Sequence, residues 1–288
     1  MILRSPGSEA TGEYPPADVR VYDELGRSGE RMLPFYRYIV IWSGLYTVHG
    51  GVTDWSNDTL GIISFSNELW SNSQYFTSPE LREQQGQQGS GIGQQVANHY
   101  FNDFLEFGAE LTEWTEFEHP QFGKVEVGGA FRKTFGRVPP RFMNEELCHR
   151  NMAFTLYQAD EMPQMRIGET KVESLGDGVF RVWVDLVNGK AAPTILAKAA
   201  ANNVVRPDIL TADGSGIEVL SAAWVPSKWR PAIAQSIDQA DLRRIIVRSG
   251  HPGRTTRTLQ YLVKGGGKLM VRYASQKGGT VEKTVVLQ

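Results

Sequence analysis

Residues 46–69 read YTVHGGVTDWSNDTLGIISFSNEL, and this stretch decides the fold. Its Gly50-Gly51 pair allows the backbone to turn sharply or to pass close to a ligand. Residues 54–60 are expected to form a short helix, which Gly61 ends. Residues 62–69 have few polar interruptions, as expected of a strand buried in a mainly parallel sheet. The stretch therefore predicts a turn, a helix and a strand of an α/β domain.

Glu68 lies near the C-terminal end of the predicted strand, flanked by Phe65 and Leu69. In parallel α/β sheets, ligands bind outside the carboxyl ends of the strands. A partly desolvated glutamate at that place would have a raised pKa, suited to proton transfer near neutral pH. The residues alone are equally compatible with a structural carboxylate that pairs with an arginine.

The order of residues in this stretch resembles that of the carboxypeptidase A-type zinc metallocarboxypeptidases. Tyr46 precedes Gly50 by four residues and Glu68 follows Asp54 by fourteen, and both intervals match the family's pattern. The resemblance extends over about the first 160 residues. Its continuation is similar to large bacterial members of the family in residues 119–129 (HPQFGKVEVGG) and 137–163 (RVPPRFMNEELCHRNMAFTLYQADEMP).

The resemblance implies an α/β fold, namely the C-terminal part of a carboxypeptidase-type mixed-sheet catalytic domain. It implies hydrolysis of C-terminal peptide bonds, or of related amides in cell-wall peptide, with a peptide-like substrate. Glu68 would match the glutamate that acts as general base, and Tyr46 the mobile tyrosine that closes over the substrate's C-terminal residue. Thr53 would match the base of the specificity pocket. Threonine there is neither apolar nor acidic, so the side-chain preference stays open.

Two of these residues also have simpler interpretations. Tyr46 could be a loop aromatic that packs on the surface, although its interval to Gly50 argues against this. Thr53, or Asp54 beside it, could be no more than the N-cap of the helix.

The mechanism of the resembled family needs zinc, which polarises the scissile carbonyl and lowers the pKa of its bound water. The family supplies zinc ligands through a His-x-x-Glu pair and a more distant histidine. No histidine of this chain is followed by Glu three residues later; the five are His49, His99, His119, His149 and His251. Glu145 and His149 are spaced for one helix face, but an isolated pair is more often a surface contact, because zinc sites need three or four ligands. We therefore expect no metal site in this chain.

The large bacterial relatives suggest where the zinc ligands would lie. In them, the third ligand histidine comes just before a segment that resembles residues 1–8, MILRSPGS. We therefore expect the zinc ligands, and the arginine that binds the substrate carboxylate, to lie upstream of Met1, and this chain alone to be inactive. Residues 1–16 do not read as a signal peptide. A secreted or periplasmic location is expected only for the full-length protein.

The rest of residues 1–162 predicts several further elements. Pro16 can begin a helix that buries Tyr22 and Leu25. Asn144 is expected to cap a later helix that ends before Pro163. The remaining elements are a strand at 36–42, a polar insertion at 72–95, a helix at 96–107 and a β-like stretch at 114–131.

The sequence after Pro163 predicts an all-β antiparallel sandwich domain, residues 163–288. A period of two is seen in residues 180–186, where the apolar Phe180, Val182, Val184 and Leu186 alternate with Arg181, Trp183 and Asp185. Trp183, Trp224 and Trp229 could form an aromatic platform for a carbohydrate, or could be buried in the core. The alternative function is therefore a non-catalytic peptide- or carbohydrate-binding protein derived from this family. A domain that only packs against the catalytic part also fits the sequence.

Composition excludes several other functions. The formal net charge is −2 without runs of like charge, which gives no general attraction to nucleic acid or anionic lipid. The single cysteine excludes an internal disulfide framework. No apolar stretch is long enough to predict a membrane span. No nucleotide-binding loop, serine nucleophile elbow or Cys/His pair suggests a rival chemistry.

Overall fold

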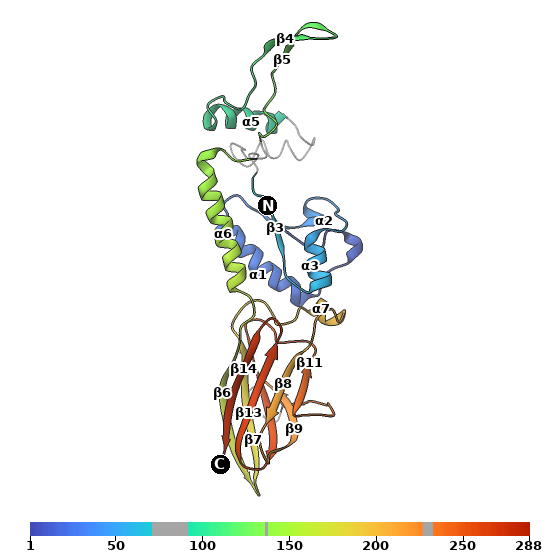
Figure 1. Ribbon diagram of the computed structural model, residues 1–288, viewed down its shortest axis with the longest axis vertical. Helices are drawn as coiled ribbons and strands as arrows, with labels where there is room; N and C mark the ends of the chain where they lie inside the picture. The colour runs from blue at the N-terminus through green and yellow to red at the C-terminus, as the bar shows by residue number, and fades with distance from the viewer. Residues whose placement is uncertain (71–91, 136–137, 227–232) are drawn as a thin grey trace. The chain divides into compact units, whose positions relative to one another are not determined.

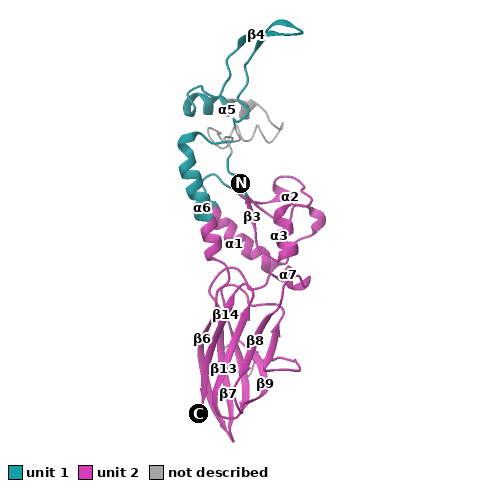
Figure 2. Cartoon of the chain, in the orientation of Figure 1, with its two compact units in different colours: residues 1, 30–37, 67–154 teal, residues 2–29, 38–66, 155–288 magenta. Residues whose placement is uncertain are grey.

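The computed structural model describes residues 1–70, 92–135, 138–226 and 233–288. It is a mixed α/β structure whose sheets are mostly antiparallel (Figure 1). The chain divides into two compact units, which are described separately (Figure 2). Unit 1 comprises residue 1, 30–37 and 67–154, and unit 2 comprises 2–29, 38–66 and 155–288. Unit 2 thus groups the predicted sandwich domain with part of the predicted domain 1–162, and the domain limits themselves stay a prediction.

A three-stranded sheet contains β1 (Ile2–Arg4), β2 (Tyr38–Val40) and β3 (Phe65–Asn67), in the order β2-β1-β3. β1 and β2 are parallel. Just beyond β3, Met1 and Glu68 exchange two backbone hydrogen bonds of 3.1 and 2.8 Å, the pattern of an antiparallel pair. The predicted strands 36–42 and 62–69 are therefore too long, because β1 offers only three residues for pairing. Residues 41–44 instead form the short helix α2 (Ile41–Gly44).

Two helices flank these strands. α1 (Pro16–Met32) begins at the predicted proline and buries Tyr22 and Leu25, as predicted, but it also buries Asp18. α3 (Val52–Leu60) confirms the predicted short helix, and Gly61 ends it in the left-handed conformation with φ 61°. Its N-cap is Gly51, which makes no side-chain cap. The predicted capping by Thr53 or Asp54 is therefore wrong.

The described part of unit 1 consists of helices and a hairpin. α5 (Ile92–Leu105) confirms the predicted helix but begins earlier, which corrects the end of the polar insertion; residues 72–91 of that insertion lie outside the described residues. β4 (Thr115–His119) and β5 (Gly123–Val127) form the hairpin. A 3-10 turn (Arg141–Met143) leads directly into α6 (Asn144–Asp160). Asn144 is thus helical itself, with φ −59°, and the predicted cap is wrong.

The sandwich forms most of unit 2. Its two antiparallel sheets have the strand orders β10-β9-β12-β7-β6 and β11-β8-β13-β14. The first sheet contains β6 (Met165–Gly176), β7 (Val179–Asn188), β9 (Glu218–Val225), β10 (Gln235–Ser236) and β12 (Thr255–Lys264). The second contains β8 (Asp208–Asp213), β11 (Arg244–Val247), β13 (Gly267–Ser275) and β14 (Gly279–Leu287).

The core of the sandwich lies between the two sheets. Phe180, Val182, Val184 and Leu186 of β7 are buried in it, as the period of two predicted. A short helix, α7 (Ala197–Ala201), connects β7 to β8 and packs a small apolar cluster against Ile63. Among the residues that the structure describes, no helix has the length and apolar character that a membrane span requires.

Candidate functional site

The predicted turn at Gly50-Gly51 is held by a contact that the sequence analysis did not foresee. Gly7 N donates to both carboxylate oxygens of Asp54, at 3.0 and 3.1 Å, and Val48 N donates to Gly7 O at 2.7 Å. A Cβ atom at position 7 would lie 2.5 Å from Asp54 Oδ2 and 2.8 Å from Val48 O. Asp54 thus fastens the loop after β1 to the first turn of α3. The only sign of this contact in the sequence was the glycine at position 7. The reason for a glycine there becomes clear only from the contact in the folded structure.

Thr53 lies beneath this turn in the first turn of α3. Its side chain is buried, and its backbone O accepts a 3.4 Å hydrogen bond from Ser64 Oγ. One turn further along the helix, the buried Asn57 donates from Nδ2 to Tyr22 OH at 3.0 Å. Asn57 Oδ1 and the buried Ser5 Oγ have no hydrogen-bond partner in the described part of the chain. The core between α1, α3 and β1 is therefore polar at its centre.

Tyr46 lies in the loop after α2. Its backbone N donates to Ile41 O at 3.2 Å, and its side chain is 62% exposed. Tyr46 and Thr53 both belong to unit 2, so the structure places one on the surface and the other in the interior of the same unit. An exposed ring is compatible with contact to a ligand and with the simpler surface interpretation.

Glu68 belongs to unit 1, so it is described by its own surroundings. Its backbone pairs with Met1, and its side chain is exposed, so the expected partial desolvation is wrong. Within unit 1, the residues on both sides are anchored: Asn67 Nδ2 donates to Asn151 Oδ1 at 2.9 Å, and Tyr36 OH donates to Leu69 O at 2.7 Å. The backbone at Glu68 is fixed while its carboxylate stays in solvent.

The residues that the structure describes do not fit a zinc site. Among the described residues, no group of three or more His, Cys, Asp or Glu side chains could hold a metal ion. Glu145 and His149 on α6 therefore remain an isolated pair. His251 is buried with Nε2 3.0 Å from Leu186 O and Nδ1 3.0 Å from Pro252 O, and burial lowers the pKa of its ring. His251 is a structural residue of the sandwich.

Within unit 2, the N-terminal segment caps a helix of the sandwich region, and the sandwich caps a helix of the N-terminal segment. Asp18 of α1 accepts hydrogen bonds from Ala197 N (2.7 Å) and Lys198 N (2.9 Å) at the start of α7. In return, Lys277 between β13 and β14 donates to Gly61 O at the end of α3. These charges complement the two helix ends, a negative group at an N-terminus and a positive one at a C-terminus.

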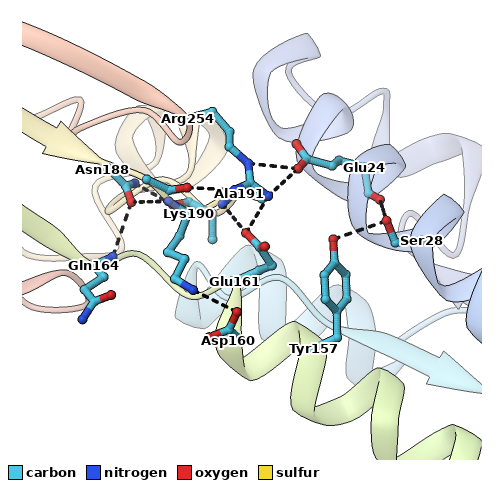
Figure 3. Close-up of polar contacts among 12 residues, drawn as sticks. Glu24, Ser28, Tyr157, Asp160, Glu161, Gln164, Asn188, Lys190, Ala191 and Arg254 are labelled. Atoms are coloured by element: carbon cyan, nitrogen blue, oxygen red, sulfur yellow. Dashed lines mark hydrogen bonds and ion pairs between the residues drawn. The ribbon is translucent and has the colours of Figure 1, made fainter.

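Arg254 joins three segments of the same contact (Figure 3). Its Nη2 lies 2.9 Å from Glu24 Oε1 on α1 and 2.9 Å from Glu161 Oε2 just after α6, and its Nη1 donates to Gly189 O at 2.8 Å. Glu161 Oε2 also accepts from Ala191 N at 2.7 Å. The turn after β7, the end of α6 and α1 are therefore fixed by one charged network.

We predict that Asp18→Ala lowers the free energy of unfolding by about 2 kcal/mol, because two partly buried N–H groups at the start of α7 lose their acceptor. Asp18→Asn keeps one acceptor oxygen and should cost less. Urea unfolding followed by circular dichroism would measure both. Equal stability of Asp18→Ala and wild type would show that the cap contributes nothing.

The Asp18 carboxyl should also make the folding stability depend on pH. Burial raises the pKa of Asp18 above its unfolded value, so the folded state binds its proton more tightly. The resulting stability is fully present below the unfolded pKa, about 3.9, and is lost as the pH rises through the folded pKa. The advantage of wild type over Asp18→Ala should therefore shrink from acidic to neutral pH; an advantage that grows would mean that hydrogen bonding outweighs burial.

Of the two alternatives for the tryptophans, a shared platform is not seen for Trp183 and Trp224. Trp183 pairs with Gln260 of β12 and Trp224 with Leu259, so the two rings lie on opposite faces of the sheet. Trp183 is 2% exposed, with Lys171 Nζ 4.8 Å from its ring centroid. Trp224 packs partly buried against the core. The third ring, Trp229, lies outside the described residues.

Comparison with known families bears on the sandwich. Residues 164–286 match the model of a family described as a domain of unknown function (DUF8731). The match begins just before β6 and ends within β14, so it covers the two sheets of the sandwich. Comparison with curated proteins gives no match for the chain.

Proposed function

We propose that residues 1–162 are the C-terminal portion of a zinc carboxypeptidase catalytic domain, and that the complete enzyme hydrolyses C-terminal peptide bonds or a related amide. The spacing of the motif in residues 46–69 carries this proposal. The contacts of Gly7 with Asp54 and Val48 support it, because they fix the chain on both sides of the Gly50-Gly51 turn within this motif. Export of the complete protein to the periplasm or medium is part of the proposal.

The proposal gives three residues distinct roles. The Glu68 carboxylate takes a proton from the attacking water and passes it to the leaving amine, and its exposure in unit 1 leaves it accessible to both. Tyr46 contacts the C-terminal residue of the substrate with an exposed ring on a loop. Thr53 lies at the base of the pocket that receives the substrate side chain, and its burial suits that place.

The zinc of the complete enzyme would be held by residues outside this chain. We therefore predict that the purified 288-residue chain contains much less than one zinc per molecule and releases no C-terminal amino acids. Metal analysis after gel filtration, together with an amino-acid release assay, would measure both. One tightly bound zinc per chain would contradict the prediction.

The test of the function uses the genomic sequence upstream of Met1. An in-frame His-x-x-Glu followed by a later histidine is expected there, and the protein extended by that sequence should release C-terminal amino acids. Adding a chelator should abolish the release, and zinc should restore it. If the reading frame upstream of Met1 lacked these residues, the proposal would be wrong.

A second candidate is a non-catalytic protein that binds peptide C-termini. The lack of a metal-binding group among the described residues is compatible with this candidate and with an enzyme whose zinc ligands lie upstream. Peptide binding that is saturable and not followed by hydrolysis in the extended, zinc-loaded protein would support this candidate over the enzyme.

A further inference from the structure

A cavity of about 750 Å³ opens within the sandwich between its two sheets. One wall comes from Trp224 of β9 and Arg257 of β12, which belong to the first sheet. The opposite wall comes from residues 244–249, on and after β11, and from the loop at 238–241. All lining residues belong to unit 2. The cavity is large enough for a small ligand.

Arg257 is the lining residue whose surroundings suggest that the cavity binds a ligand. It pairs with the core residue Leu186, which places it on the inner face of its sheet. Its guanidinium lies 4.0 Å from the ring centroid of Trp224, and its Nη1 donates to Gly250 O in a long hydrogen bond of 3.4 Å. Arg257 is half-buried, and this burial lowers its pKa. Within the described ranges, no carboxylate lies at ion-pair distance from it.

Two other arginines of the sandwich, Arg254 and Arg181, each pair with a carboxylate. Arg254 pairs with Glu24 and Glu161, and Arg181 pairs with Glu173 at 3.0 Å. Removing a guanidinium from water is costly unless an anion and further hydrogen bonds compensate for the lost hydration. The cost at Arg257 is therefore offset in part by Trp224, and among the described residues a hydrogen bond is seen for only one of its five N–H donors, that to Gly250 O.

The other charged residues of the lining balance one another. Arg244 and Arg248 add two positive charges to that of Arg257, against the two negative charges of Asp238 and Asp241. One of these acids is engaged locally, since Asp241 Oδ1 accepts a hydrogen bond from Arg243 N at 3.0 Å. The charges of these four residues cancel, so the net positive charge of the lining is that of Arg257, which has no carboxylate at ion-pair distance within the described residues.

We propose that this cavity binds an oxyanion, the carboxylate or phosphate group of a small ligand, through bidentate hydrogen bonds from Arg257. The planar fork of a guanidinium matches both groups, and Trp224 holds the plane of that fork. The ligand would be a carboxylate-bearing sugar or a phosphate ester, and the shared group is what the site recognises. The proposal does not depend on the carboxypeptidase assignment.

The test measures binding of inorganic phosphate, acetate and glucuronate to the full chain by isothermal titration calorimetry at constant ionic strength. We expect saturable binding of at least one anion, weakened at least tenfold in Arg257→Gln. The matched control is Arg166→Gln, an exposed arginine on β6, which should bind as wild type does. Phosphate alone would indicate a phosphate ester, and acetate with glucuronate a carboxylate; no saturable binding of any anion would overturn the proposal.

Two further variants separate binding from folding. Arg257→Lys keeps the charge but loses the fork, so we expect affinity between those of wild type and Arg257→Gln. Trp224→Phe should retain calorimetric binding but lose the change in tryptophan fluorescence that the anion causes in wild type. Should Arg257→Gln unfold, Arg257→Lys decides: affinity equal to that of wild type would overturn the bidentate site.

Discussion

Replacing Glu68 by glutamine in the upstream-extended protein is expected to lower kcat for release of C-terminal amino acids by about 10²–10⁴-fold, the usual contribution of a general acid–base residue. Glutamine has nearly the same shape but cannot take up the proton. Because the Glu68 backbone is held by Met1 and its side chain is exposed, the substitution should leave folding unchanged. The pH dependence of kcat/KM should also lose its acidic limb.

The control for this prediction is Glu218→Gln, an exposed glutamate on β9 of the sandwich. It should leave kcat unchanged, so that a general loss of negative charge is excluded as the cause. Circular dichroism and zinc content of each variant should match those of the parent protein. Undiminished kcat in Glu68→Gln, with zinc bound, would end the assignment of Glu68 as the general base.

The largest effect on stability is expected from Gly253→Ala, at about 3 kcal/mol or more. A Cβ atom at this position would lie 2.6 Å from Ala191 C and 2.8 Å from Lys190 O, so the backbone of the turn after β7 would have to move. That turn donates Ala191 N to Glu161 and accepts a 2.9 Å hydrogen bond from Arg254 N at Lys190 O. The clash would therefore disturb the whole charged network of Arg254.

Gly189→Ala is the matched control, because it changes a glycine of the same turn. No atom lies within 4 Å of a Cβ atom there, so the substitution should change stability by no more than about 1 kcal/mol, in the stabilising direction. Urea unfolding monitored by tryptophan fluorescence would compare the two variants. Similar midpoints for Gly253→Ala and Gly189→Ala would show that the turn adjusts freely.

Much of the local structure could be predicted from the sequence. The alternation in residues 180–186 predicted β7, because a strand that faces the core on one side has a period of two. Gly61 marked the end of α3, because few other residues adopt the left-handed conformation there without strain. The burial of Tyr22 and Leu25 followed from helical periodicity.

The errors concern residues whose partner is distant in the sequence. Asp54 was expected to cap its own helix, but its carboxylate binds Gly7 N, 47 residues away. Asp18 was not predicted to be buried, and its partners in α7 lie about 180 residues further along the chain. When a side chain could cap its own helix, nothing in the neighbouring sequence shows that it will instead accept a hydrogen bond from a distant N–H group.

The sequence of residues 46–69 by itself determined the helix, its end at Gly61 and the spacing from Tyr46 to Glu68, because these depend on neighbouring residues. Only the tertiary structure decided that Gly7 and Asp54 shape the turn, that Glu68 is exposed and that Arg257 lacks a counter-ion in the described chain. Burial and charge pairing depend on which segments meet in space. The energies of burial and charge pairing depend on distances between atoms in the folded structure, and these distances cannot be read from the spacing of residues in the sequence.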